Sequence, residues 1–186
     1  ACSRDASHVE YAYFDYEGPM FDDVDPYGFY YSAVNWAVNH SPVITQGTGE
    51  GKFSPDANCT RGEMVTFLWR AMGCPEPENI NNPFWDVSSD MFYYKPVLWA
   101  VQNGITNGTS ETTFSPYDTV DRAQTVTFLW RMAGSPAELA SIPFWDVLFG
   151  QYYTNAILWA VKNHITNGLT ANTFGPADPC TRAQIV

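Results

Sequence analysis

The feature that most constrains the fold of this chain is a pattern that occurs three times in the same order. A Phe-Trp-Asp-Val run at 84–87 recurs at 144–147, and the related Phe-Asp-Asp-Val stands at 21–24. After each run come a Trp-Ala-Val step, an Ile-Thr step, a Phe-x-Pro step and an arginine step. A repeated unit of this kind cannot bury its apolar surface alone, so neighbouring units pack on one another. We therefore predict a single domain built from three repeats rather than three independent units.

Each repeat predicts two helices that flank a polar loop. In the second repeat, apolar residues from Tyr93 to Val101 recur at the spacing of one helix face. The second helix of each repeat follows a good N-cap residue, with Glu or Gln three positions later as in a capping box; the caps are Thr60, Asp121 and Thr181. The fold class is accordingly mainly α, with three helix–loop–helix repeats in one pseudo-threefold domain and short β pairs in the loops.

The repeats also set the expected boundaries along the chain. Residues 1–20 form an N-terminal segment outside the pattern, and the repeats occupy 21–75, 84–136 and 144–186. The third repeat is truncated in its second helix, because the sequence ends at Val186.

The composition excludes several classes of partner. The net charge of −11 disfavours nucleic acid and anionic lipid. No apolar run is long enough to span a membrane. Charged residues make up 16% of the chain, below the roughly 25% of an average soluble domain, and aromatic residues also reach 16%. A surface of rings, amides and hydroxyls in place of charges favours sugars as ligands.

The arginine that follows each N-cap is the strongest candidate for a binding residue. A cation in the first turn opposes the helix dipole, so its presence in all three repeats indicates that it has a partner. One interpretation is an internal salt bridge to the aspartate of the early motif; the other is a fork for the carboxylate or phosphate of a ligand. The arginines are Arg61, Arg122 and Arg182, and the aspartates are Asp23, Asp86 and Asp146.

Two further residue types recur and are candidates for ligand binding. The tryptophans of the Trp-Ala-Val step are either platforms on which sugars stack or a widening of the apolar helix face; they are Trp36, Trp99 and Trp159. The glycines after the Ile-Thr step either adopt a positive φ in a turn or let a ligand approach the backbone; they are Gly47, Gly108 and Gly168.

The four cysteines form either two disulfides or free buried thiols. Cys59 and Cys74 lie at opposite ends of one predicted helix, beyond the reach of a disulfide. Cys59 and Cys180 precede equivalent helices, so the favoured oxidised pattern is Cys59–Cys180 with Cys2–Cys74.

The sequence offers little for catalysis. Its three histidines are not placed at a fixed spacing from a serine, cysteine or aspartate, and no metal site or cofactor motif is present. We therefore predict a protein that is not an enzyme and that needs no cofactor or metal.

Taken together, the order Phe-x-Asp-Val, Ala-Val, Ile-Thr-x-Gly, Phe-x-Pro and Thr-Arg-Ala-Gln resembles the S-layer homology (SLH) module over residues 21–186. The resemblance implies a three-pronged spindle of three modules with grooves between neighbours. In such grooves the family's arginine contacts the pyruvyl carboxylate of the ligand, supported by the early aspartate, an aromatic residue and loop glycines.

The resemblance also implies the function, the partner and the location. The expected function is non-covalent anchoring of a secreted protein to the bacterial cell wall, through secondary cell-wall polysaccharide that carries pyruvylated sugars. The expected location is the cell surface, the cell wall or a surface layer. The alternative is a structural subunit that assembles with other copies of itself, or with surface-layer proteins, into a layer or filament.

Overall fold

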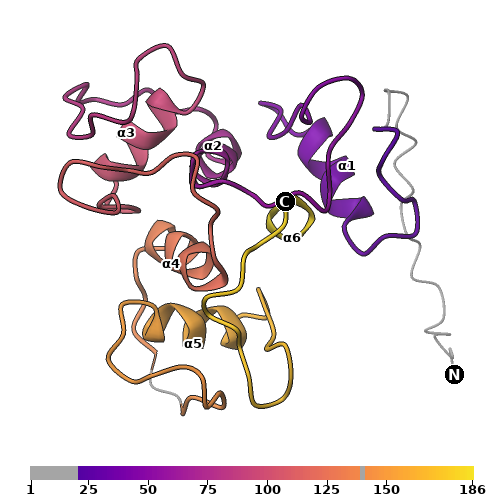
Figure 1. Cartoon of the computed structure of the whole chain (residues 1–186), viewed down its shortest axis with the longest axis vertical. Helices are drawn as coiled ribbons and strands as arrows, with labels where there is room; N and C mark the ends of the chain where they lie inside the picture. Colours follow the sequence, from indigo (N-terminus) through magenta and orange to yellow (C-terminus); the bar gives the residue numbers. More distant parts are fainter. Residues whose placement is uncertain (1–20, 139–140) are drawn as a thin grey trace, which may run out of the picture.

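The helices of the structure alternate with long loops along the chain (Figure 1). This computed structural model describes residues 21–138 and 141–186, so the predicted N-terminal segment 1–20, with Cys2, lies outside the described residues. The first helices of the repeats are α1 (Tyr31–Asn39), α3 (Tyr94–Gln102) and α5 (Thr154–Lys162). The second helices are α2 (Arg61–Ala71), α4 (Arg122–Met132) and α6 (Arg182–Ile185).

The second helices begin where the caps predict, but one capping box is missing. In α2 the Thr60 N–H donates to Glu63 Oε2 at 2.8 Å, and Thr60 Oγ1 accepts the Glu63 N–H at 3.3 Å. The start of α6 has the same arrangement between Thr181 and Gln184. In α4 the Asp121 carboxylate accepts the N–H of Gln124 at 2.7 Å, but the Gln124 side chain does not return to the cap. The Gln124 side-chain oxygen instead accepts a hydrogen bond from Arg61 Nη1 at 2.8 Å.

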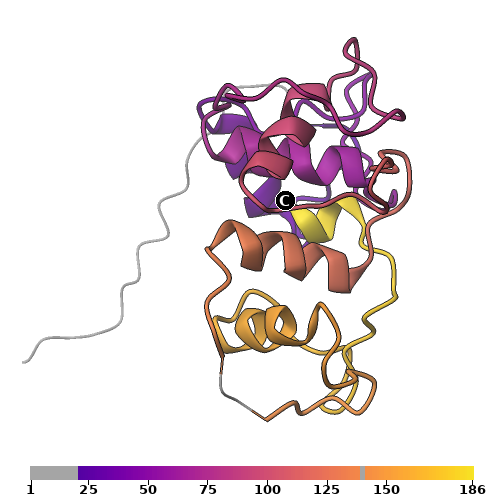
Figure 2. The same cartoon turned by 90° about the vertical axis from the view of Figure 1, so that its left-hand side faces the viewer.

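Two of the second helices pack against a first helix of the following repeat. The chain packs α2 against α3 and α4 against α5. Figure 1 shows α6 beside α1, so α2, α4 and α6 surround the centre and the first helices lie outside them. Figure 2 shows the α2–α3 pair above the α4–α5 pair after a quarter turn. The units that pack in space are therefore offset from the units that repeat in the sequence.

Backbone hydrogen bonds join the three repeats at the centre. Cys59 N donates to Cys180 O at 2.9 Å, Val120 N to Cys59 O at 2.9 Å, and Cys180 N to Val120 O at 3.0 Å. These three residues precede the second helices at equivalent positions, so the bonds form a closed cycle in which each repeat donates once and accepts once. Such a cycle leaves none of these N–H groups unpaired, which is what a buried backbone requires.

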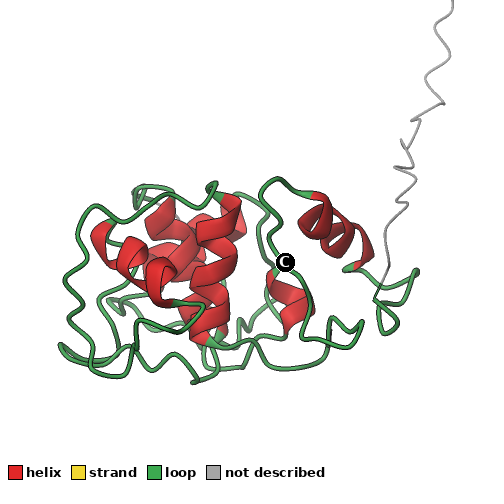
Figure 3. Ribbon diagram, turned by 90° about the horizontal axis from the view of Figure 1, so that it is seen from above, coloured by secondary structure: helices red, strands yellow, loops and turns green. Residues whose placement is uncertain are grey.

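The predicted β pairs differ from what the structure contains. The described residues show isolated bridges and no strand arrow (Figure 3). Most of these bridges join the residues just before the second helices of different repeats, such as Thr60 with Thr119, rather than the Ile-Thr and Thr-Phe segments of one loop. The loops turn too tightly for long ladders, because a positive φ interrupts them at Gly47 and again at Gly108.

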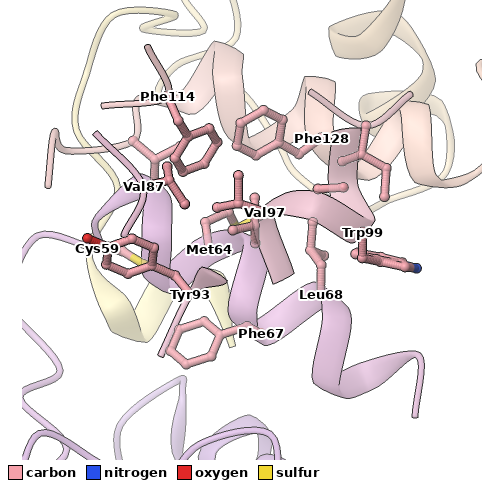
Figure 4. Packing of buried hydrophobic residues seen from close by; sticks show 14 of the residues in the cluster. Cys59, Met64, Phe67, Leu68, Val87, Tyr93, Val97, Trp99, Phe114 and Phe128 are labelled. Carbon is pink, nitrogen blue, oxygen red and sulfur yellow. The ribbon is translucent and has the colours of Figure 1, made fainter. Parts of the chain in front are cut away.

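The buried side chains form three clusters, and the largest of them contains residues from all three repeats. The largest lies between α2 and α3, where Met64, Leu68, Val97 and Tyr93 meet (Figure 4). The second joins α4 to α5, and the third lies under α1 around Val34. The largest cluster also includes Ala37 of α1, Phe128 of α4 and Cys180, so buried side chains as well as the central backbone cycle connect the helix pairs.

The mainly helical fold with helix–loop–helix repeats is confirmed, and strands play no part in it among the described residues. Among those same residues, no helix is both long and apolar enough to cross a membrane.

The predicted Cys59–Cys180 disulfide is not formed in this structure. Both thiols are free and buried, although the two residues are neighbours at the central cycle. Burial raises the pKa of each thiol, so the reactive thiolate is disfavoured there. The Cys2–Cys74 pairing involves a residue outside the described ranges.

Candidate functional site

The arginine at the start of each second helix reaches the loop of another repeat. Its Nε donates a hydrogen bond to the backbone oxygen of the phenylalanine in that loop's Phe-x-Pro step. The pairs are Arg61 with Phe114, Arg122 with Phe174 and Arg182 with Phe53, at 2.8 to 2.9 Å. The repeats therefore follow one another in a cycle here as well, with the third bonded to the first.

The same guanidinium groups lie over the rings of the phenylalanines that they hold. The distance from the guanidinium carbon to the ring centroid is 4.8 Å for Arg61, 4.5 Å for Arg122 and 4.9 Å for Arg182. Contacts of this kind are favourable where water is excluded. Arg61 and Arg182 are almost fully buried, with 4% and 3% of their surface exposed, whereas Arg122 is half-buried.

The remaining donors of the three arginines meet different partners. Arg182 Nη1 forms an ion pair with Glu63 Oε1. The equivalent Nη1 of Arg61 donates to the neutral amide oxygen of Gln124 at 2.8 Å, and Nη2 of Arg122 donates to Asn167 O at 2.8 Å. In both Arg61 and Arg182 the Nη2 atom is buried and has no hydrogen-bond partner. A buried charged donor without an acceptor is costly, so either group would be stabilised by one further hydrogen bond to an oxygen.

The early aspartates do not pair with these arginines, so of the two interpretations left open by the sequence, the internal salt bridge is not found in this structure. Each aspartate accepts the N–H groups of two consecutive loop residues in its own repeat. Asp86, for example, accepts from Phe114 at 2.9 Å and from Ser115 at 2.7 Å. Asp23 and Asp146 do the same for the loops at Phe53 and Phe174.

The phenylalanine of the Phe-x-Pro step in each loop is therefore held from both sides. The aspartate of its own repeat binds its N–H, and the arginine of another repeat binds its C=O. Because the aspartate oxygens already accept the loop N–H groups, the aspartates do not bond to the arginine guanidinium, and the guanidinium bonds to other acceptors.

These hydrogen bonds affect the ionisation of Asp23. Burial by itself raises the pKa of this carboxyl group, but the N–H groups of Phe53 and Ser54 outweigh it, and the net pKa lies below the ordinary value of 3.8. The folded loop therefore stabilises the ionised carboxylate.

The loop glycines have a structural role that the sequence left open. Gly47 and Gly108 adopt φ values of 78° and 84°. A Cβ on Gly108 would lie 2.4 Å from Thr113 O and 2.5 Å from the Phe84 ring. Gly168 has no positive φ, but a Cβ there would meet Phe144 at 2.4 Å. All three glycines thus let the loop backbone pack directly on the phenylalanine of the early motif.

The three tryptophans do not occupy one common environment. Trp99 is buried with 6% of its surface exposed, Trp159 is half-buried, and Trp36 is 57% exposed. Trp99 therefore belongs to the apolar face of its helix, as the second interpretation predicted. The ring of Trp36 lies 5.0 Å from that of His40.

A groove brings together two of the residues predicted from the sequence. It has a volume of about 340 Å³ and lies where the first loop, α2, the second repeat and α6 meet. Arg182 and Gly47 line it, while none of the early aspartates or the tryptophans does. We call it the Arg182 groove; its other lining residues are Thr45, Gln46, Thr48, Glu63, Thr66, Phe67, Arg70 and Phe92.

None of these eight other lining residues was among the predicted site residues, and three of them bear directly on the site. Glu63 was assigned only to the capping box, and its second oxygen turns out to bind Arg182. Arg70 holds the first loop through Ile44 O at 3.0 Å, as Arg131 does for Ile105 O at 3.2 Å. Phe92 is 58% exposed. The signal for Phe92 was present, because an aromatic residue precedes each first helix at this position, but repetition alone does not show which face it occupies.

The sequence of this chain matches one family model and resembles three proteins of known name. A family model described as "S-layer homology domain" matches residues 21–65, 83–126 and 149–186. The "Surface-layer 125 kDa protein" of Lysinibacillus sphaericus is 29% identical over 75% of this chain and 12% of its own length. A "Cell surface protein" of Thermoanaerobacter kivui is 30% identical over 61% of the chain and 15% of its own. An "Endoglucanase" of Bacillus sp. (strain KSM-635) is 34% identical over 55% and 11%. The matched region thus spans a small part of each relative.

The lowered pKa of Asp23 predicts a pH dependence of stability. At pH 7 the Asp23→Asn variant should unfold more easily than the wild type, because the charged acceptor for two N–H groups is lost. The contribution of Asp23 is present above the unfolded-state pKa, near 3.8, and disappears as the pH falls through the lower folded-state pKa. Urea unfolding at pH 7 and in acid should therefore show the difference between the two proteins shrinking. A difference that stays constant or grows in acid would contradict this assignment.

The glycine geometry predicts unequal effects of alanine at two positions with a positive φ. Gly104→Ala should cost about 1–2 kcal/mol for the left-handed backbone, since a Cβ there meets nothing within 4 Å. Gly108→Ala should cost about 1–3 kcal/mol more, because its Cβ would collide with Thr113 O and the Phe84 ring. Thermal unfolding of the two variants provides the comparison. Equal losses would mean that the close approach at Gly108 does not restrain the loop.

Proposed function

The chain belongs to the S-layer homology domain family, and from this premise we propose that it anchors a surface protein to the bacterial cell wall by binding anionic, pyruvylated secondary cell-wall polysaccharide. The family is a cell-wall anchoring module rather than a catalytic domain, and its relatives include proteins of surface layers and cell surfaces. This is a secreted protein of the cell surface or cell wall. The relative named as an enzyme shares only 11% of its length with this chain, which agrees with an accessory role for the shared region.

The observation that carries the proposal is an open groove lined by Arg182, a residue whose Nη2 is buried and has no hydrogen-bond partner. The groove combines a guanidinium, threonine hydroxyls, a glutamine amide and an exposed phenylalanine ring, Phe92. Hydroxyls and amides suit the hydroxyl and acetamido groups of sugars, and an aromatic ring offers a stacking surface for their apolar faces. A carbohydrate oxygen at Nη2 would also remove the cost of an unpaired buried donor.

We extend the same role to the equivalent arginines, Arg61 and Arg122. The cyclic bonds from each arginine to the next loop support a pseudo-threefold arrangement with one binding position between each pair of neighbouring repeats. In this proposal the aspartates and glycines act indirectly: Asp23, Asp86 and Asp146 hold the loops, and Gly47, Gly108 and Gly168 let those loops pack closely. Trp36, which lies outside the Arg182 groove, is not assigned to the ligand.

A structural subunit that assembles into a layer is the second candidate, favoured by the likeness to a surface-layer protein. The two functions differ in what the purified protein does without any wall material. An anchoring module stays small in solution, whereas a layer subunit forms ordered polymers. Light scattering of the protein in wall-free buffer separates them.

The anchoring proposal predicts a loss of wall binding when the arginines are changed. Arg61→Ala or Arg182→Ala should weaken sedimentation with purified cell-wall sacculi by about 1.5–3 kcal/mol, the value of a hydrogen bond to a charged group. Circular dichroism and thermal unfolding check that the variants fold. Lys95→Ala is the matched control, because it removes an exposed cation whose partner is Glu76.

The wild-type protein supplies an independent arm of the same experiment. Sacculi from which the secondary polymer has been extracted should no longer retain it. Equal retention on extracted sacculi, or unchanged binding by a folded Arg61→Ala, Arg122→Ala, Arg182→Ala triple variant, would show that the ligand or the site is different.

A further inference from the structure

The loops of the second and third repeats share an Asn-Gly step, but its surroundings differ between them. The step is Asn107-Gly108 in the second repeat and Asn167-Gly168 in the third, and both asparagines are exposed. In an Asn-Gly step the backbone nitrogen of the glycine can attack the side-chain amide of the asparagine, because glycine has no side chain to obstruct the approach. The contacts around each step therefore decide how readily it reacts.

The backbone nitrogen of Gly168 is free, whereas that of Gly108 is engaged. The Gly108 N–H donates to Thr106 Oγ1 at 3.1 Å. In the third loop Thr166 donates its hydroxyl to Asn167 O at 3.2 Å instead, and among the described residues no group accepts the Gly168 N–H. The backbone differs accordingly, since Gly108 has a φ of 84° and Gly168 has no positive φ.

The backbone oxygen of Asn167 also accepts a hydrogen bond from a cation. Arg122 Nη2 donates to it at 2.8 Å, in addition to the bond from Thr166. A peptide nitrogen is conjugated with its carbonyl oxygen, so Asn167 O carries much of the negative charge that forms when the Gly168 N–H loses its proton. Donors that are already fixed where charge develops lower the barrier to its formation. Arg122 and Thr166 are placed as such donors.

The other Asn-Gly steps lack this combination. No arginine in the described ranges donates to Asn107 O, because the equivalent Arg61 bonds to Phe114 and Gln124. A third step, at 103–104, follows α3, and both of its reacting groups are held there. The asparagine side chain and the glycine N–H each donate to a backbone oxygen of that helix, at 2.8 and 3.0 Å.

From these contacts we propose that Asn167-Gly168 is a site of spontaneous modification, at which Arg122 and Thr166 promote deamidation of Asn167. The Gly168 nitrogen gives its proton to hydroxide and bonds to Cγ of Asn167, and the side-chain nitrogen takes up a proton from water and leaves as ammonia. Water then opens the succinimide ring. Cleavage of the new bond gives aspartate, and cleavage of the original peptide bond gives isoaspartate. The inference is independent of wall binding.

Isoaspartate at this position would disturb the third loop. It carries the backbone through the former side chain and so lengthens the chain by a carbon atom before Gly168. The loop has little room for this change, because even a Cβ on Gly168 would lie 2.4 Å from the ring of Phe144. The modified protein should therefore unfold at a lower temperature than the fresh protein.

The rates of the three steps in one protein test the inference. Purified wild-type protein is aged in mildly alkaline buffer, and peptide mapping by mass spectrometry measures the loss of each amide. Asn167 should react about tenfold faster than Asn107 or more, and Asn103 should react slowest. In guanidinium chloride, where the contacts are lost, Asn107 and Asn167 should react at similar rates. Equal rates in the folded protein, or a faster reaction at Asn107, would overturn the inference.

Arg122→Ala separates the effect of the guanidinium from that of loop mobility. Loss of the donor should slow deamidation of Asn167 about tenfold. A loop that had only become looser would react faster, so the two effects have opposite signs. Thr166→Val removes the second donor at similar volume and should also slow the reaction. Arg131→Ala is the matched control, because that arginine bonds to the second loop at Ile105 O, and it should leave the rate at Asn167 unchanged.

Circular dichroism and thermal unfolding check that the fresh variants fold. An unchanged or faster loss of the Asn167 amide in both folded variants, Arg122→Ala and Thr166→Val, would show that neither donor assists the reaction.

Discussion

The hydrogen bond from an arginine of one repeat to a phenylalanine carbonyl of another is the interaction on which the rest of this structure depends. It occurs three times, at Arg61, Arg122 and Arg182, and it closes the order of the repeats into a cycle. The aspartate that belongs to the same repeat as the phenylalanine accepts the N–H of that phenylalanine. One peptide segment in each loop is thus fixed by two different repeats, so the position of each loop depends on how the repeats pack. The guanidinium is fixed by the same contact, which places its remaining donors at the junction between repeats.

Much of the helical architecture was predictable because it depends on local rules. The N-caps Thr60 and Thr181 and the apolar spacing of the first helices determine where helices begin and which face they bury. The partners of Arg61 and Arg182 were not predictable in the same way. Phe114 lies 53 positions after Arg61, and Phe53 lies 129 positions before Arg182, so only the packing of whole repeats brings them together. Repetition identified the arginines as important residues but left their partner open, and the aspartates considered for that role bind loop N–H groups instead.

The repeats also show that equivalent positions need not have equivalent roles. Trp36 and Trp99 occupy the same place in their repeats, yet one is exposed and the other buried. Gln124 corresponds to Glu63, yet only Glu63 completes a capping box. The tryptophans stand in the same Trp-Ala-Val step, whereas the helix starts at Glu63 and Gln124 differ in sequence as well as in contacts. A pattern in a single sequence therefore predicts which positions matter better than it predicts what each one contacts.

The offset between sequence repeat and packed helix pair has a consequence for any attempt to exchange modules between proteins. Because α2 packs on α3 and α4 on α5, a junction placed in the linker at 75–83 would separate two helices that share one apolar cluster. A junction in the polar loop between a first and a second helix would keep each helix pair intact, together with the linker that connects its two members. Chimeras of this chain are therefore better assembled from segments such as 61–102 than from whole sequence repeats.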